Sequence, residues 1–187
     1  MDTSSPHNFL RSLMLPLKEI DNALPQRGKI VDLGCGEGVI AEFLARKNSR
    51  RVIGVDLDEK RLKESGQKNL RFQVGDIRKF KLDKIDGVII SDVLHHVNFQ
   101  DQKSILKNIT SSLKKGGVLV IKEIDTGEFI RSKLSRFWDL VFYPGDKIYF
   151  NDAISLKKLL ESYGFTVSIK RPTRLFPGST TLFVCKK

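Results

Sequence analysis

The sequence predicts an α/β fold with a parallel sheet, and three observations support this prediction. Residues 29–44 have the pattern of a short buried strand, a turn with three glycines and the start of a helix. Further segments at 51–55, 70–74 and 86–90 have the length and composition of strands, and each is followed within two residues by an aspartate. Helical patterns between and after these runs are typical of chains that wind a parallel sheet.

The first strand runs into the segment V-D-L-G-C-G-E-G at residues 31–38. Its alternating glycines allow a tight turn whose backbone N–H groups can approach a ligand; they are Gly34, Gly36 and Gly38. A dinucleotide-binding fingerprint would require glycine where Val39 stands. Asp32 lies within the strand end, where the charge of a pyrophosphate would be unfavourable. The turn therefore favours a ligand that carries a positive charge, such as an ammonium group.

The composition is that of a single globular domain. The chain has 187 residues, 40% of them hydrophobic and 29% charged, and a net charge of +11. The basic residues are spread along the chain without interleaved aromatics, so a solvated basic surface is favoured over a dedicated nucleic-acid face. No apolar run reaches the length of a membrane span, and two cysteines make no disulfide framework. We therefore expect a cytoplasmic protein.

Residues 1–28 form a leader with a helical pattern interrupted by Pro16, and they could pack on the domain or close over its ligand. We expect the main domain to span residues 29–187. Asp56 follows the second strand, beside the glycine turn, where a carboxylate can accept from both hydroxyls of a ribose. The alternative is that Asp56 or Asp58 caps a helix over 59–65, and we expect Asp58 to be the cap.

The second half contains a helix over 101–114, a strand over 118–121, an aromatic segment at 126–150, a helix capped by Asn151 or Asp152, and strands over 165–169 and 180–185. Asp76 follows the third strand, and taken on its own it is better explained as an aspartate of a surface turn.

These motifs together resemble class I S-adenosylmethionine-dependent methyltransferases. The resemblance rests on V-D-L-G-C-G-E-G, V-I-G-V-D at 52–56, V-G-D-I at 74–77 and K-K-G-G-V-L-V-I at 114–121, and it covers residues 29–187. It implies a Rossmann-like sheet of seven strands, mostly parallel, with helices on both faces and an antiparallel last strand. The strand count made from the sequence agrees with it.

The resemblance also implies a binding site for S-adenosylmethionine. Asp32 and the turn around Gly34, Cys35, Gly36 and Gly38 would hold the methionine part, and Ser91 would lie near the reacting methyl group. Asp56 would hold the ribose, and Leu57 would pack on the adenine. Asp76 would accept from the adenine amino group, and Ile77 would offer its N–H.

Methyl transfer requires alignment of acceptor and methyl group, and a general base only where the acceptor arrives protonated. The candidates for that base are His95, His96 and Asp92, which follow the fourth strand; a structural role is the alternative for either histidine. Adjacent histidines on a regular helix cannot both face one ion, so we expect no metal.

The aromatic segment 126–150 is interpreted as a cap over a small apolar or aromatic acceptor, with Phe129, Trp138 and Tyr149 as substrate contacts. The alternatives are additional core and a helix at a membrane surface, because basic residues lie opposite the aromatic stripe. Two other functions stay open. The net charge would suit an RNA or protein methyltransferase, and the cofactor site alone would suit a binding protein without catalysis.

Overall fold

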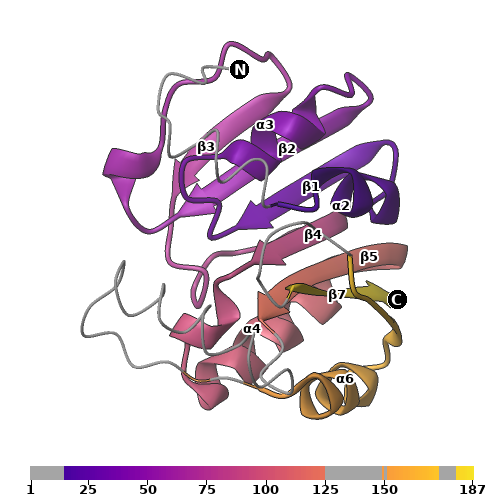
Figure 1. The fold of residues 1–187 in the computed structure, drawn as a ribbon. Helices are drawn as coiled ribbons and strands as arrows, with labels where there is room; N and C mark the ends of the chain where they lie inside the picture. Colours follow the sequence, from indigo (N-terminus) through magenta and orange to yellow (C-terminus); the bar gives the residue numbers. More distant parts are fainter. Residues whose placement is uncertain (1–14, 125–148, 150, 173–179) are drawn as a thin grey trace.

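A central sheet organises the protein (Figure 1). The computed structural model describes residues 15–124, 149, 151–172 and 180–187, and seven strands of these residues form one sheet in the order β3-β2-β1-β4-β5-β7-β6. β7 runs antiparallel to both of its neighbours, and the pairs among β1–β5 are parallel. The predicted mostly parallel, seven-stranded sheet with an antiparallel last strand is confirmed. The strands are β1 (Gly28–Leu33), β2 (Arg50–Asp56), β3 (Leu70–Val74), β4 (Ile85–Ser91), β5 (Leu113–Ile124), β6 (Thr166–Lys170) and β7 (Thr180–Lys186).

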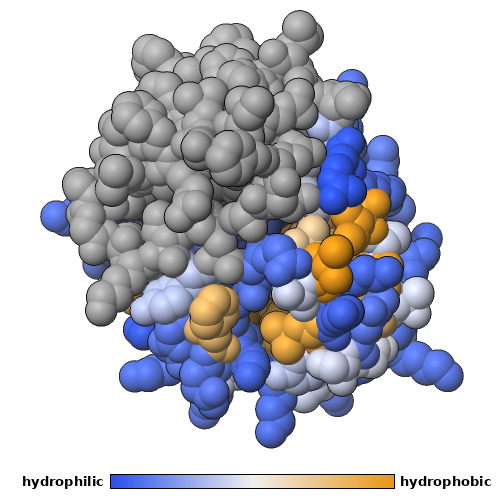
Figure 2. Space-filling view, turned by 60° about the horizontal axis from the view of Figure 1, so that its bottom comes forward, coloured by the Kyte–Doolittle hydropathy of each residue, from blue (hydrophilic) through white to orange (hydrophobic). Residues whose placement is uncertain are grey.

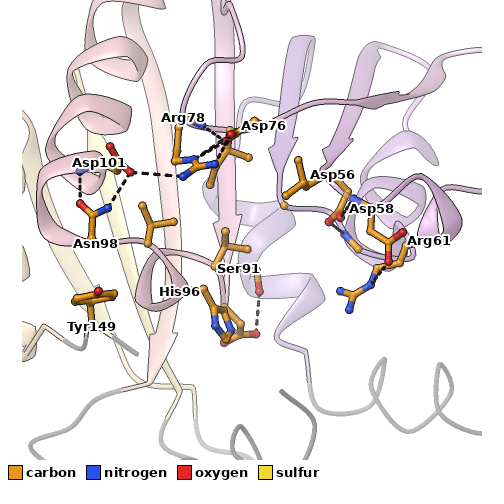
Figure 3. Close-up of a pocket in the computed structure, with 17 residues that line it drawn as sticks. Asp56, Asp58, Arg61, Asp76, Arg78, Ser91, His96, Asn98, Asp101 and Tyr149 are labelled. Carbon is orange, nitrogen blue, oxygen red and sulfur yellow. Dashed lines mark hydrogen bonds and ion pairs between the residues drawn. The ribbon is translucent and has the colours of Figure 1, made fainter. Parts of the chain in front are cut away.

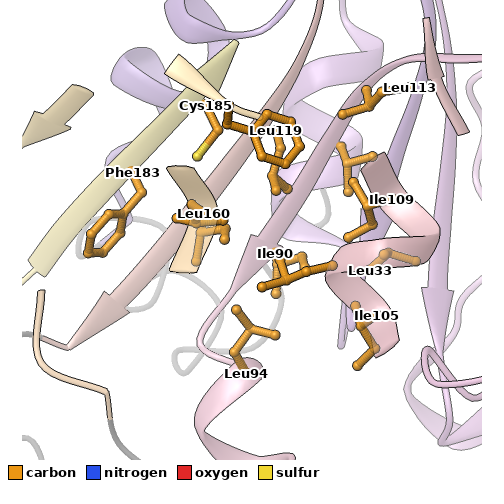
Figure 4. Packing of buried hydrophobic residues seen from close by; sticks show 14 of the residues in the cluster. Leu33, Ile90, Leu94, Ile105, Ile109, Leu113, Leu119, Leu160, Phe183 and Cys185 are labelled. Carbon is orange, nitrogen blue, oxygen red and sulfur yellow. The ribbon is translucent and has the colours of Figure 1, made fainter. Parts of the chain in front are cut away.

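Helices cover both faces of the sheet. α2 (Leu17–Ala23) and α3 (Val39–Ala45) pack in one hydrophobic cluster, and α4 (Phe99–Ser112) and α6 (Ala153–Ser162) in another. Neighbouring strand residues alternate between the clusters: Ile30 joins the first and Val31 the second, as the two-residue period of a strand requires. Figure 4 shows Ile90 beside α4 residues such as Ile105 in the second cluster. Because both faces are buried, the central strands read as continuous apolar runs.

The described part of the leader packs against the sheet through Leu17 and Ile20. Arg50, which is 1% exposed, donates to the carbonyl of Pro25 at 2.8 Å and pairs with the Asp21 carboxylate. These contacts fix α2 at the start of β2. Residues 1–14 lie outside the described residues.

Three predicted boundaries were wrong. The helix expected over 59–65 is only the 3₁₀ turn η1 (Glu59–Arg61); none of its residues is buried, so no apolar face stabilises a longer helix. Asp58 caps this turn as predicted, accepting from the Lys60 N–H at 3.0 Å. α4 begins at Phe99 because Asn98 caps it, and it ends at Ser112. β5 starts at Leu113, with a register shift against β4 before the predicted strand at 118.

Hydrophilic residues cover most of the described surface in Figure 2, interrupted by small hydrophobic patches. In the part of the chain that the structure describes, no helix has the length and apolar character needed to cross a membrane.

Candidate active site

A cavity of about 710 Å³ opens at the carboxyl ends of the parallel strands (Figure 3). β1 lies between β2 and β4, so the strand order runs outward from β1 toward both edges of the sheet. In open α/β sheets, ligands bind at the carboxyl ends of the strands where the strand order changes direction in this way. The cavity therefore lies where the fold itself favours a ligand. Its lining residues are Gly34, Gly36, Asp56, Leu57, Asp58, Arg61, Asp76, Ile77, Arg78, Ser91, Asp92, Val93, His96, Val97, Asn98, Asp101 and Tyr149.

The glycine turn brings backbone, without side chains, to the cavity wall. Gly34, Gly36 and Gly38 have φ values of 77°, 54° and 81°, in the region that favours glycine. A Cβ added at Gly34 would lie 2.4 Å from Val93 Cγ2, and one at Gly38 would lie 2.4 Å from Phe72 Cζ. Gly34 and Gly36 line the cavity, whereas Gly38 supports the turn from behind.

Two residues of the motif lie beneath the main cavity. Asp32 is 1% exposed and lines, together with Cys35, a small adjacent cavity of about 10 Å³ that also borders Gly34 and Ser91. Burial, with the nearby carboxylates of Asp32 and Asp56, raises the pKa of the Cys35 thiol well above its ordinary value. Burial of this kind disfavours the reactive thiolate form of Cys35.

Asp56 is fixed in the cavity by two backbone donors. Its Oδ2 accepts from the Gly36 N–H at 2.7 Å, and its Oδ1 accepts from the Asp58 N–H at 3.0 Å. Each oxygen keeps a second lone pair, so the carboxylate can accept two further hydrogen bonds. Leu57 beside it is 67% exposed and lines the cavity, where its side chain offers an apolar surface to a flat ligand.

Asp76 differs from Asp56 because the Arg78 side chain already donates hydrogen bonds to its carboxylate. Arg78 donates to both Asp76 oxygens through Nε, at 2.9 and 3.0 Å, and through Nη2 at 2.6 Å. These hydrogen bonds are the main cause that lowers the pKa of Asp76. Ile77 follows, and the residue is 9% exposed.

Lys122, near the end of β5, holds Asp92 in place. The Lys122 Nζ lies 2.5 and 2.6 Å from the two Asp92 oxygens, and Ser91 Oγ lies 3.3 Å from Asp92 Oδ2. Asp92 has a φ of 56°, which is uncommon for a residue other than glycine. Backbone strain of this kind gathers at functional sites.

The structure separates the two histidines. His96 lines the cavity, whereas His95 is 2% exposed and its Nδ1 lies 2.6 Å from Glu123 Oε2. The other oxygen of Glu123 accepts from the Leu94 N–H at 3.0 Å. His95 therefore anchors the 3₁₀ turn η2 (Leu94–His96) to β5, and its neighbour His96 faces the cavity.

Tyr149 is the one predicted substrate residue that the described residues include. It lines the cavity, its N–H donates to the His95 carbonyl at 2.7 Å, and its ring meets Phe99 edge to face at 5.6 Å. Gln102, 1% exposed, donates to the Leu94 and Val97 carbonyls and holds this wall together. Phe129 and Trp138 lie outside the described residues.

Several lining residues escaped the sequence reasoning: Arg61, Arg78, Val93, Val97, Asn98 and Asp101. Asn98 had a recognisable signal, because an asparagine three residues before an aspartate at a helix start is a capping pattern. Arg61 and Arg78 had no recognisable signal in the sequence, because their contacts depend on the path of the turns that contain them. Among the described residues, no group of three or more histidines, cysteines or carboxylates could hold a metal ion.

A family model described as a methyltransferase domain matches residues 7–168, which is most of the chain. The chain belongs to the S-adenosylmethionine-dependent methyltransferase family. A crystal structure of such an enzyme from Archaeoglobus fulgidus superposes with a TM-score of 0.77 at 19% identity, covering 96% of this chain and 94% of that one. Magnesium protoporphyrin IX methyltransferase from Synechocystis, with bound SAH, gives a TM-score of 0.68 at 21% identity and covers 97% and 83%. These likenesses establish the fold that the sequence resemblance implied.

Sequence relatives are similar over a shorter stretch. The ubiquinone biosynthesis O-methyltransferase of Coxiella burnetii is 33% identical over 118 residues, 58% of this chain and 49% of that protein. The carboxy-S-adenosyl-L-methionine synthase of Shewanella pealeana is 31% identical over 107 residues, 51% and 44% of the two chains. The match thus spans about half the length of these curated relatives.

Proposed function

We propose that this protein transfers a methyl group from S-adenosylmethionine to a small apolar or aromatic acceptor. The observation that carries the proposal is that a single cavity contains most of the residues expected to hold the cofactor together with an apolar wall and a histidine. Asp56, Leu57 and Ile77 lie in the cavity with His96 and Tyr149.

The cavity fits the cofactor on the side of β1 to β3. The two remaining lone pairs of Asp56 suit the two ribose hydroxyls, and the exposed Leu57 offers a surface for the adenine. The glycine turn leaves room for the methionine part above Asp32 and Ser91. S-adenosylmethionine, when bound, supplies a methyl group already activated on a sulfonium.

The acceptor would lie against Val93, Val97 and Tyr149 on the side of β4 and α4. His96 is the best placed base, because it lines this wall and Asp92 is already paired with Lys122. With a hydroxyl acceptor, His96 would take the proton as the oxygen becomes the nucleophile. An O-methyltransferase among the sequence relatives supports a hydroxyl acceptor.

The charge of the lining argues against an anionic acceptor. Five carboxylates line the cavity and only two guanidinium groups do, although the whole chain carries +11. An acidic cavity favours a cationic cofactor and repels phosphate groups near the reacting atoms. The basic residues that give the chain its net charge therefore lie mostly outside this cavity. We also infer a reducing compartment such as the cytoplasm, because Cys35 and Cys185 are free buried thiols.

The test is a methylation assay with purified protein, S-adenosylmethionine and a panel of small phenols, aliphatic alcohols and amines. We expect turnover of a phenol or alcohol, reduced in His96→Asn by about 10²- to 10⁴-fold in kcat at neutral pH. His96→Asn should still bind the cofactor, which separates loss of the base from misfolding. Cofactor binding by the wild type without turnover of any acceptor would instead favour a binding protein, and full activity of His96→Asn would remove the histidine from the mechanism.

A further inference from the structure

The two aspartates expected to hold the nucleoside differ in how many hydrogen bonds they can still accept. A carboxylate offers about four lone-pair sites. Asp56 uses two of them for backbone N–H groups and keeps two. Asp76 has all four sites contacted by Arg78: Oδ1 accepts from the backbone N–H, Oδ2 accepts from Nη2, and the single Nε hydrogen is shared between the two oxygens. An adenine amino group can reach Asp76 only if a guanidinium bond is released.

Arg78 has a second carboxylate within reach. Its Nη1 lies 3.8 Å from Asp101 Oδ2, and Figure 3 shows the guanidinium between Asp76 and Asp101, at one side of the cavity. The Arg78 side chain is 48% exposed, and exposed ion pairs contribute little to stability. Water can therefore solvate the guanidinium when a ligand amine displaces it, and the released arginine keeps Asp101 as its partner.

We infer that Arg78 is a specificity-determining residue of the purine subsite: it occupies Asp76 in the free protein and moves to Asp101 when an adenine amino group binds. This inference rests on the proposed function, because it takes the ligand to be an adenosyl compound. Arg78 competes with a 6-amino purine for the carboxylate. Arg78 favours binding of a 6-oxo purine, because the oxygen at position 6 can only accept hydrogen bonds. The guanidinium has further N–H donors for that oxygen while it remains on Asp76.

Removal of Arg78 should therefore change the affinities for the two ligands in opposite directions. The probes are S-adenosylhomocysteine and its 6-oxo analogue S-inosylhomocysteine, titrated by calorimetry against folded wild type and Arg78→Met. We expect Arg78→Met to bind S-adenosylhomocysteine about two- to fivefold more tightly, the range for loss of an exposed ion pair. The same variant should bind the inosyl compound about tenfold more weakly, because a charge-assisted hydrogen bond is lost.

Arg61→Met is the matched control. Arg61 lines the same cavity, its side chain is 40% exposed, and it pairs with Asp58 at 3.5 Å. Removal of Arg61 takes the same charge from the cavity but leaves the contacts of Asp76 unchanged. The affinities for both ligands should therefore change in the same direction. Asp101→Asn should weaken S-adenosylhomocysteine about two- to fivefold, because the displaced guanidinium loses its second partner.

The outcomes separate this inference from the function on which it rests. If the wild type binds S-adenosylhomocysteine but Arg78→Met shifts both ligands in the same direction, or shifts neither, the competition for Asp76 is refuted. Unchanged affinity in Asp101→Asn would refute the move to Asp101. If the folded wild type binds neither compound, the proposed function fails and the inference with it.

Discussion

The glycine turn allows a quantitative test, because two glycines of this chain share one positive φ in different surroundings. Gly34 and Gly116 both have a φ of 77°. A Cβ at Gly34 would lie 2.4 Å from Val93 Cγ2, whereas a Cβ at Gly116 would meet nothing within 4 Å. Alanine at either position costs about 1–2 kcal/mol for the positive φ. At Gly34 the overpacking against Val93 adds about 1–3 kcal/mol.

Gly34→Ala should thus lose about 2–5 kcal/mol of unfolding free energy, and Gly116→Ala only about 1–2 kcal/mol. Urea denaturation followed by circular dichroism measures both. In a chain of this size 1 kcal/mol corresponds to about 2–4 °C, so a thermal melt gives an independent comparison. Equal losses in the two variants would show that Val93 moves aside without cost, and the reasoning about a tightly packed turn would be refuted.

Two further predictions concern ionisable groups. Burial opposes ionisation of Asp21, but hydrogen bonds from Lys47 and Arg50 outweigh it and lower the pKa of Asp21 below 3.8. The stabilisation is therefore present above about pH 3.8 and disappears as the pH falls through the lower folded pKa. Asp21→Asn should lower the free energy of unfolding at pH 7 by about 3 kcal/mol in urea denaturation, because the buried Arg50 loses its counter-ion. This loss should become smaller in acid, and a loss that is the same at every pH would contradict the ion pair. Burial also raises the pKa of Cys185 to about 12 and raises the pKa of Cys35. Both thiols should therefore react with a disulfide reagent only after unfolding, and fast reaction of the native protein would refute this prediction.

Much of the fold could be predicted because its signals are local. The strand at 70–74 was predicted with its observed bounds, and the glycine turn and the cap at Asp58 follow from the preferences of single residues. For the last helix the sequence left Asn151 and Asp152 as alternatives, and the structure has Asp152 as the cap. The helix expected over 59–65 failed for the opposite reason: its extent depends on whether the sheet offers an apolar surface, which the segment itself does not encode.

The site was predictable to the extent that it lies at strand ends. Asp56, Asp76 and Ser91 line the cavity because parallel strands bring their carboxyl ends to one edge. The difference between His95 and His96 could not be predicted, since it depends on the direction of a single 3₁₀ turn and on a carboxylate at position 123. The occupation of Asp76 by Arg78 was likewise hidden, because it requires a turn that folds position 78 back onto position 76.

The most direct test of the account is a calorimetric titration with S-adenosylmethionine. Wild type should bind one equivalent, and Asp56→Ala should bind at least about tenfold more weakly, because the hydrogen bonds from the ribose to a charged acceptor are lost. Asp83→Ala is the matched control, since Asp83 is exposed and does not line the cavity, and it should bind as the wild type does. No binding by folded wild type, or undiminished binding by folded Asp56→Ala, would contradict the central claim that this cavity holds the methyl donor.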